Sequence, residues 1–170
     1  FPSLQHIPQI TGHYTAVTDF VGRENLVADM SERFATSKVA QSASRVVLQG
    51  LGGQGKSTLA LEYARRFAAR YHLIVVIDAE TQDTIDRSLH RITDELRLSS
   101  GQLSGEALRK IMVPFLTVHP GWLLILDNVE DPDLISPYLP RTGGDIIITT
   151  RSQAWPKSSL IRLSTLEPET

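Results

Sequence analysis

The stretch GLGGQGKST, Gly50 to Thr58, decides the fold of this chain because it joins a short apolar segment to a helical one. Val46 to Leu48 precede it, and Leu59 to Glu62 follow it directly. Its four glycines in nine positions let the main chain adopt conformations that other residues avoid. The stretch therefore predicts a buried strand, a tight turn and a helix in immediate succession.

The same stretch matches the phosphate-binding pattern G-x-x-x-x-G-K-[ST]. In this pattern, backbone N–H groups of the loop and of the helix start converge on an anion. Lys56 is predicted to bridge the β- and γ-phosphates of a nucleotide, and the Ser57 hydroxyl to bind magnesium. By chance, about one chain in a hundred of this length would carry such a match. The loop residues predicted to contact the nucleotide are Gly50, Gly52, Gly53, Gln54, Gly55, Lys56, Ser57 and Thr58.

Short apolar segments recur along the chain and alternate with helical patterns. The segments predicted as strands are residues 45–49, 72–77, 122–126, 146–148 and 160–163. Strands of nearly continuous apolar residues are typical of parallel sheets that helices cover on both faces. The predicted fold is therefore an α/β three-layer sandwich of the P-loop NTPase type, with a mainly parallel sheet of roughly five strands.

The segments between these strands carry helical periodicity. Helices are predicted over residues 24–34, 56–70 and 105–118, and along the apolar stripe Ile85, Leu89, Ile92 and Leu96. Pro114 should kink or end the helix in which it lies, because it lacks a backbone N–H. Arg65, Arg66 and Arg70 lie on the outer side of their helix and are predicted to form a solvated face.

The composition fits one globular domain. The chain has 170 residues, of which 41% are hydrophobic and 21% charged, and its formal net charge of -2 calls for neither nucleic acid nor an anionic membrane as a partner. It has no cysteine, which excludes disulfides and thiolate metal sites. No apolar stretch approaches the roughly 18 residues of a membrane span, and the start does not resemble a secretion signal. We therefore expect a cytoplasmic setting.

The ends of the sequence suggest an excised fragment of a longer protein, because Phe1 begins it and the last residues carry no closing signal. Residues 1–19 are interpreted as an extended lead-in. Residues 20–165 are predicted to form the nucleotide-binding domain, and residues 166–170 to begin a truncated following domain. The histidines, which show no metal-ligand spacing, are His6, His13, His72, His90 and His119.

Two further polar groups end predicted strands at the edge where the glycine-rich loop lies. Asp127 follows the apolar run Trp122 to Leu126 and is predicted to be the second magnesium ligand. Alone, such a residue is more often a turn aspartate, and the loop is what favours the metal ligand. Thr149, Thr150 and Arg151 end another buried strand, where the Arg151 guanidinium could contact a γ-phosphate.

These segments together carry a family resemblance. In order they are FVGRE (Phe20 to Glu24), GLGGQGKST, HLIVVIDAE, WLLILDNVED and IIITTR. They resemble the nucleotide-binding core of the NB-ARC family, STAND-class P-loop NTPases found in plant resistance proteins, the apoptosome scaffold and fungal NOD-like receptors. The run VVIDAETQDTIDRSL is similar to the fungal branch in particular.

The resemblance implies roles for individual residues. Val21 and Arg23 would lie near the adenine, Asp127 would be the Walker B acid, and Arg151 would read the γ-phosphate. The strand that ends in Thr150 would lie between the Walker A and Walker B strands. Asn128 departs from the family, whose members often carry a second acid there. Because an amide is a poor proton acceptor, hydrolysis should be slow unless Glu130 or Asp131 substitutes.

The resemblance also implies a function, namely an ATP/ADP switch in signal transduction, innate immunity or programmed cell death. The parent protein would carry an effector domain before this one and helical and sensor-repeat domains after it, including the family's Gly-x-Pro and His-Asp motifs. Its ATP-bound form would assemble into homo-oligomers. Adenine is favoured over guanine because no Asn-Lys-x-Asp motif is present.

Two other classes of function stay open. A metabolic kinase would need an acceptor pocket and usually a lid, and no segment rich in Arg and Lys suggests one. A DNA-linked ATPase of the initiator type shares the sheet and the arginine, although nucleic acid is not an expected partner here.

Overall fold

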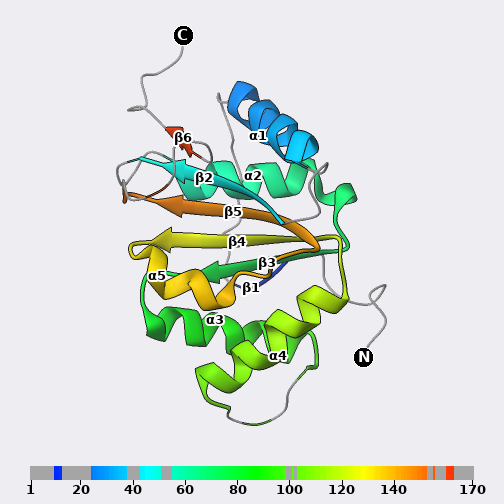
Figure 1. The fold of residues 1–170 in the computed structure, drawn as a ribbon, viewed down its shortest axis with the longest axis vertical. Coiled ribbons are helices and arrows are strands. Elements are labelled where there is room, and N and C mark those ends of the chain that lie inside the picture. Colours follow the sequence, from blue (N-terminus) through cyan, green and yellow to red (C-terminus); the bar gives the residue numbers. More distant parts are fainter. Residues whose placement is uncertain are drawn as a thin grey trace.

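The computed structural model describes residues 10–12, 24–37, 43–50, 55–98, 101, 103–152, 155 and 160–162. It is an α/β sandwich of three layers, in which helices cover both faces of a central sheet (Figure 1). The strands are β1 (Ile10–Gly12), β2 (Ser44–Gln49), β3 (Leu73–Asp78), β4 (Trp122–Val129), β5 (Gly144–Thr150) and β6 (Leu160–Arg162). The helices are α1 (Glu24–Ser37), α2 (Lys56–Arg66), α3 (Gln82–Glu95), α4 (Gly105–Val118) and α5 (Pro132–Ile135), with short 3-10 turns η2 (Ala68–Arg70) and η3 (Ser136–Tyr138).

The described strands form one parallel sheet in the order β1-β3-β4-β5-β2-β6. The predicted fold class is confirmed, and β5 lies between β2 and β4 as the family resemblance implied. The predicted number of strands was one too low, because the sheet has six strands. The missed strand β1 lies inside the segment interpreted as a lead-in, and its three residues are too few to show a periodicity.

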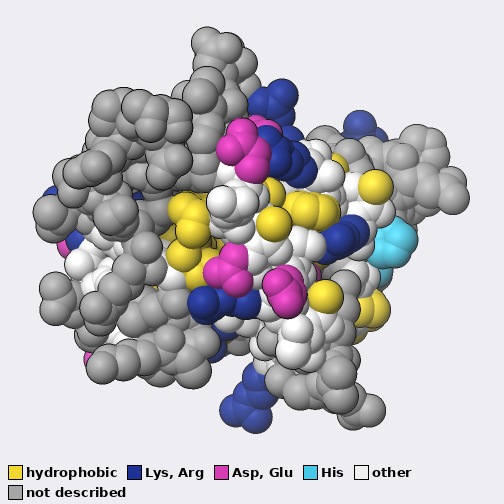
Figure 2. Space-filling view, turned by 90° about the horizontal axis from the view of Figure 1, so that it is seen from above, with side chains coloured by type: hydrophobic (Ala, Val, Ile, Leu, Met, Phe, Trp, Pro, Cys, Tyr) yellow, Lys and Arg dark blue, Asp and Glu magenta, His cyan; other side chains and the backbone are white. Residues whose placement is uncertain are grey.

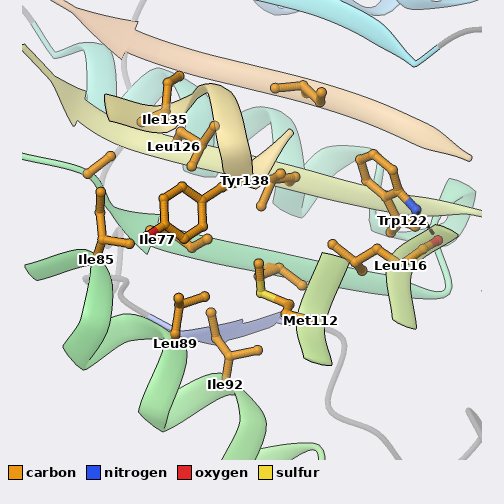
Figure 3. Close-up of a cluster of buried hydrophobic side chains, with 14 of the residues drawn as sticks. Ile77, Ile85, Leu89, Ile92, Met112, Leu116, Trp122, Leu126, Ile135 and Tyr138 are labelled. Carbon is orange, nitrogen blue, oxygen red and sulfur yellow. Dashed lines mark hydrogen bonds between the residues drawn. The ribbon is translucent and has the colours of Figure 1, made fainter. Parts of the chain in front are cut away.

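Alternate residues of each strand point to opposite faces of the sheet, as strand geometry requires. Val46 and Leu48 of β2 pack on one face with α1 and α2; in Figure 1, α1 lies above the strands and α2 overlaps β2. Val47 of β2 faces the other side, toward α3 and α4. Figure 3 shows how the side chains of this second layer converge from the strands, α3 and α4. Both faces are therefore apolar, which explains why the strand sequences lack polar alternation.

The predicted apolar stripe of α3 is confirmed. Its side chains, all 1% exposed or less, are Ile85, Leu89, Ile92 and Leu96. A side chain caps this helix, because the Thr81 hydroxyl accepts a hydrogen bond from the Thr84 backbone N–H. Each turn of α3 thus places one apolar residue against the sheet.

Pro114 lies inside α4 and does not end it, because the helix continues to Val118. The helix predicted over residues 105–118 is confirmed, and of the two effects expected from Pro114, a kink or an end, the end does not occur. Pro114 is exposed, so the backbone carbonyl that loses its partner can face solvent. The helix predicted over residues 56–70 ends earlier than expected, at Arg66, and continues as the 3-10 turn η2. Within the described residues, no helix is both long and apolar enough to cross a membrane.

The outer face of α1 and α2 mixes acidic and basic side chains, as Figure 2 shows from above. Arg65, Arg66 and Arg70 are exposed, as predicted for a solvated face. Arg66 pairs with Glu62 at 2.9 Å, and Arg70 donates to the Ser31 hydroxyl at 2.7 Å. The first contact lies within α2 and the second ties η2 to α1, so the basic cluster is part of the surface structure.

Candidate functional site: a phosphate-binding cavity at the carboxyl edge

The carboxyl ends of β3, β4, β5 and β2 meet at one edge of the sheet, because the strands are parallel and adjacent. A cavity of about 380 Å³ opens there. Two backbone hydrogen bonds join the segments that follow these strands. Gly50 N–H donates to the Thr150 carbonyl at 3.1 Å, and Ala79 N–H donates to the Asp127 carbonyl at 2.7 Å. The described residues that line it are Gly55, Lys56, Ser57, Thr58, Glu80, Asn128, Glu130, Thr150 and Arg151.

The start of α2 forms one wall of this cavity. Gly55 precedes the helix with a φ of 78°, in the left-handed region that favours glycine, and no side chain caps the helix. The first N–H groups of α2 therefore remain available to an anion. Together with the positive end of the helix dipole, they make this wall attractive to phosphate.

Ser57, in the first turn of α2, contacts the acid predicted opposite it. Its hydroxyl donates to Asp127 Oδ1 at 2.7 Å. The Thr149 hydroxyl donates to the same oxygen at 2.6 Å, and the Asn128 amide approaches Oδ2 at 3.3 Å. Asp127 is 7% exposed, so these donors stabilise a buried carboxylate in one orientation. The structure thus brings together the two residues predicted to bind magnesium.

An irregularity in the sheet creates this arrangement. The β4–β5 register shifts between Leu126 and Val129, and Asn128 adopts a φ of 61°. The Asn128 backbone N–H then donates to the Thr149 hydroxyl at 2.9 Å instead of continuing the ladder. Asn tolerates this left-handed conformation better than most residues. The bulge aims Asp127 at α2 while the Asn128 side chain faces the cavity.

Lys56 begins α2 and is 8% exposed. Burial lowers its pKa, and the positive charge of Arg151 lowers it further, whereas the carboxylates of Asp127 and Glu130 act in the opposite direction. A lysine ammonium in such surroundings is incompletely solvated. The negative charge of a bound polyphosphate would stabilise this ammonium further.

Arg151 and Glu130 lie at the rim of the cavity. Glu130 Oε1 accepts from Arg151 Nη2 at 2.8 Å and from Nε at 3.3 Å. Hydrogen bonding to Glu130 raises the pKa of Arg151, so the guanidinium is charged. The two side chains are 55% and 44% exposed, which makes their ion pair weak enough for a phosphate to displace it.

The structure places most of the predicted site residues around one cavity. Gly55, Lys56, Ser57, Thr58, Asn128, Thr150 and Arg151 line it, and Asp127 lies behind Ser57. Gly50 directly follows β2 and does not line the cavity. The Thr150 hydroxyl stabilises the bulge by donating to the Val129 carbonyl. Val21, Arg23, Gly52, Gly53 and Gln54 lie outside the described residues.

Sequence reasoning missed two residues of this site. Thr149 fixes the Asp127 carboxylate, and Glu80, in the turn after β3, lines the cavity. The two threonines Thr149 and Thr150 at the end of an apolar strand were a sequence signal for Thr149. Glu80 carried no signal by itself, because its position depends on β3 lying beside β4.

The donor set of this cavity fits a nucleotide with magnesium. The oxygens of Ser57 and Asp127 are the hard ligands that magnesium prefers, and Lys56 with the open helix start suits its phosphates. Nowhere do the described residues contain a cluster of three His, Asp or Glu side chains that could hold a metal ion by itself.

Comparison with known families agrees with this site. The pattern of the NB-ARC domain matches residues 23–169. This chain belongs to the NB-ARC family. The family predicted from the sequence motifs is thereby confirmed, and this NB-ARC domain is a P-loop NTPase domain. Membership implies nucleotide binding, usually with magnesium.

Two curated proteins are similar to this NB-ARC domain. A nucleotide-binding leucine-rich repeat (NLR)-like protein of Hyaloscypha variabilis is 25% identical over 154 residues, which cover 78% of this chain and 16% of that protein. The regulatory protein AfsR of Streptomyces coelicolor is 27% identical over 170 residues, which cover 90% of this chain and 17% of that protein. The chain thus spans less than a fifth of the length of either relative.

Solved structures share the fold of this NB-ARC domain. Cdc6p of Pyrobaculum aerophilum has a TM-score of 0.59 at 16% identity, covering 84% of this chain and 45% of that one. The ORC1 protein of Aeropyrum pernix, solved in complex with DNA, has a TM-score of 0.54 at 21% identity, covering 94% and 47%. At these identities the likeness concerns the fold alone.

Proposed function

We propose that this NB-ARC domain binds ATP and ADP with magnesium and serves as the nucleotide-dependent switch of a longer signalling protein. The observation that carries the proposal is the contact of 2.7 Å between Ser57 and Asp127 beside a cavity lined by Lys56 and the uncapped start of α2. Each group has the chemistry that a magnesium–polyphosphate ligand requires.

Each residue has a defined task in this proposal. Lys56 and the N–H groups at the start of α2 hold the phosphates, and Ser57 and Asp127 hold magnesium, whose charge neutralises phosphate oxygens when it is bound. Arg151 exchanges its Glu130 partner for a γ-phosphate, so its position distinguishes ATP from ADP. By the family resemblance, Val21 and Arg23 lie near the adenine.

We propose slow hydrolysis because the groups around Asp127 are poor bases. Asn128 carries an amide where an acid would orient water. Of the two proposed substitutes, Asp131 accepts from the Asp133 backbone N–H at 3.0 Å at the start of α5, and Glu130 is paired with Arg151 until Arg151 turns to a γ-phosphate. A slowly hydrolysed nucleotide suits a switch better than a metabolic enzyme.

The wider signalling role rests on family membership and on the NLR-like relative. In this proposal the exchange of ADP for ATP frees the parent protein to form homo-oligomers and to activate an effector domain in the cytoplasm. Innate immunity and programmed cell death are the processes that the family suggests. The helical and sensor-repeat domains of the parent would close over the nucleotide.

The direct test is to identify the nucleotide that the purified chain retains. Mass spectrometry after denaturation should recover ADP in near-equal amount, and isothermal titration should give a lower ADP affinity for Lys56→Ala by at least about tenfold. Lys110→Ala is the matched control, because Lys110 lies on α4 and pairs with Glu106 at 3.4 Å. Unchanged ADP affinity in Lys56→Ala would disprove the proposal.

A DNA-linked ATPase is the alternative that the ORC1 likeness raises. That likeness concerns the fold alone, and the net charge of -2 does not favour DNA binding. The discriminating measurement is the affinity for duplex DNA at two salt concentrations. Binding that weakens steeply with salt would support the alternative, and absence of binding would exclude it.

A further inference from the structure

Glu80 is a carboxylate in a cavity otherwise suited to anions. It lies two residues beyond β3 and lines the cavity together with Lys56 and Arg151. Among the described residues, its carboxylate accepts no hydrogen bond and forms no ion pair. It also contributes to the raised pKa of Arg151, which places its charge near that guanidinium. A carboxylate repels phosphate, so Glu80 weakens phosphate binding unless it has a role in the chemistry of the site.

The other acidic groups near the cavity are occupied. Asp127 accepts from Ser57 and Thr149, and Glu130 accepts from Arg151. Asn128 lines the cavity, but its amide cannot accept a proton at neutral pH. Within the described lining, Glu80 is therefore the carboxylate that no neighbouring side chain holds before a nucleotide binds. Glu130 is released only when Arg151 turns to a γ-phosphate, so the test must compare Glu80 with Glu130.

The backbone around Glu80 is fixed on both sides. Ala79 N–H donates to the Asp127 carbonyl at 2.7 Å and so ties the segment to β4. Thr81 caps α3 through reciprocal hydrogen bonds with Thr84, at 3.2 Å and 3.0 Å. A side chain carried on such a backbone starts from a defined position, which general-base catalysis requires.

The strand order sets Glu80 opposite the phosphate-binding wall. Lys56 follows β2, and Glu80 follows β3, with β5 and β4 between these two strands. The same cavity is lined by the start of α2 and by Glu80, so a polyphosphate held at the start of α2 would share the cavity with the Glu80 carboxylate. Water that attacks the terminal phosphorus from the side remote from the leaving group would lie on the Glu80 side.

We infer that Glu80 is the general base of the slow hydrolysis, an inference that rests on the proposed nucleotide function. The Glu80 carboxylate accepts a proton from water as the water oxygen bonds to the terminal phosphorus. The bond between that phosphorus and the bridging oxygen breaks, and the electron pair leaves with the nucleoside diphosphate. Inorganic phosphate and the diphosphate are the products, so Glu80 supplies the function that Asn128 lacks.

The test compares single-turnover hydrolysis of ATP with ATP affinity in matched glutamate variants. Glu80→Gln should lower the hydrolysis rate by at least about tenfold while it binds ATP no more weakly than the unsubstituted chain. Glu80→Asp, which keeps a shorter carboxylate, should retain part of the rate. Glu106→Gln is the control, because Glu106 is an exposed residue of α4 that pairs with Lys110.

The outcomes separate this inference from the proposed function. Failure of the unsubstituted chain to bind ATP or ADP would disprove the proposed function itself. Binding with a normal hydrolysis rate in Glu80→Gln, or binding without any hydrolysis by the unsubstituted chain, would overturn only the role of Glu80. Loss of hydrolysis in Glu130→Gln alone would assign the base to Glu130. Circular dichroism of each variant checks that the exposed substitution leaves the fold intact.

Discussion

At the scale of single residues, Gly55 fixes how the phosphate loop enters α2. Its φ of 78° is costly for any residue with a Cβ, although a Cβ there would meet nothing within 4 Å. Gly55→Ala should lower the free energy of unfolding by about 1 kcal/mol and weaken ADP binding by about tenfold, because the backbone must shift to relieve the strain. Urea titration and isothermal titration measure the two effects.

Gly101 offers the matched control for this substitution. Its φ is +93°, and a Cβ there would also meet nothing within 4 Å. Gly101→Ala should therefore cost about as much stability and leave the ADP affinity unchanged. An equal loss of affinity in both variants would show that the effect is one of global stability and not of the loop.

The two tryptophans differ in how their indole N–H groups are paired. Trp122 is fully buried and donates to the Leu116 carbonyl at 2.8 Å, whereas the buried Trp155 Nε1 has no partner in the described part of the chain. Trp122→Phe should lower the free energy of unfolding by about 2 kcal/mol, because it leaves that carbonyl unpaired. Trp155→Phe should cost less than about 1 kcal/mol. Urea denaturation compares them, and a reversed order would contradict this account.

The site residues that could be predicted were those of a local motif. Lys56 and Ser57 follow from the spacing of the glycine-rich loop, and Asp127 follows from its place after an apolar strand. The hydroxyl contact of Thr149 with Asp127 could not be predicted, since it depends on the β4–β5 bulge. Glu80 could not be predicted either, because the sequence does not state which strand neighbours β4.

At the scale of elements, a buried polar chain ties α2, η2 and β5 together. The Tyr71 hydroxyl donates to Asp145 Oδ2 at 2.7 Å, and the Tyr63 hydroxyl lies 2.7 Å from that of Tyr71. Burial is the main cause that raises the pKa of Tyr71, and its bonds with Tyr63 and Asp145 add to the effect. The neutral tyrosine is therefore the form that the folded state favours.

This raised pKa gives stability a defined pH dependence. Below the ordinary tyrosine pKa of 10.0 the contribution is fully present. Above it, Tyr71 ionises in the unfolded chain but not in the folded one, so stability falls as pH rises. Tyr71→Phe should lower the free energy of unfolding by about 1–3 kcal/mol at neutral pH, and its decline above about pH 10 should be shallower.

Urea titrations between about pH 7 and pH 11 measure this difference. Tyr138→Phe is the control on the opposite face of the sheet, because the Tyr138 hydroxyl accepts from the Gln82 amide at 2.9 Å and, among the described residues, forms no hydrogen bond with a carboxylate. It should cost about 1 kcal/mol. A decline above pH 10 that is equally steep in Tyr71→Phe and the unsubstituted chain would refute the role of Tyr71.

Elements with a long apolar periodicity could be predicted, and short ones could not. The stripe of α3 defined that helix because four residues repeat at helical spacing and all are buried. β1 is three residues long and was missed because it is defined by its pairing with β3. The helix over residues 105–118 was predicted with the bounds of α4, and Pro114 does not end it because its exposed position lets the carbonyl that loses its partner face solvent.

At the scale of the whole molecule, the sheet joins the phosphate site to both apolar layers. β2 and β4 each contribute residues to both layers and end at the cavity. A ligand that binds only the folded state therefore stabilises the entire domain. At a free concentration of about 100 times its Kd, ADP with magnesium should add about 2.7 kcal/mol, and the Tm should rise by about 5–10 °C.

The magnesium part of this stabilisation should depend on Ser57. Thermal unfolding with ADP, in magnesium and in a chelator, should give the unsubstituted chain a higher Tm in magnesium, because the Ser57 and Asp127 oxygens then bind the metal. Ser57→Ala should lose this difference. Ser104→Ala is the matched control, because it removes a hydroxyl from the start of α4, where it caps Ala107 N–H at 3.2 Å, and costs about 1 kcal/mol. Ser104→Ala should keep the full difference in Tm between magnesium and chelator. If Ser57→Ala also keeps it, the metal is held by other oxygens and the proposed role of Ser57 fails.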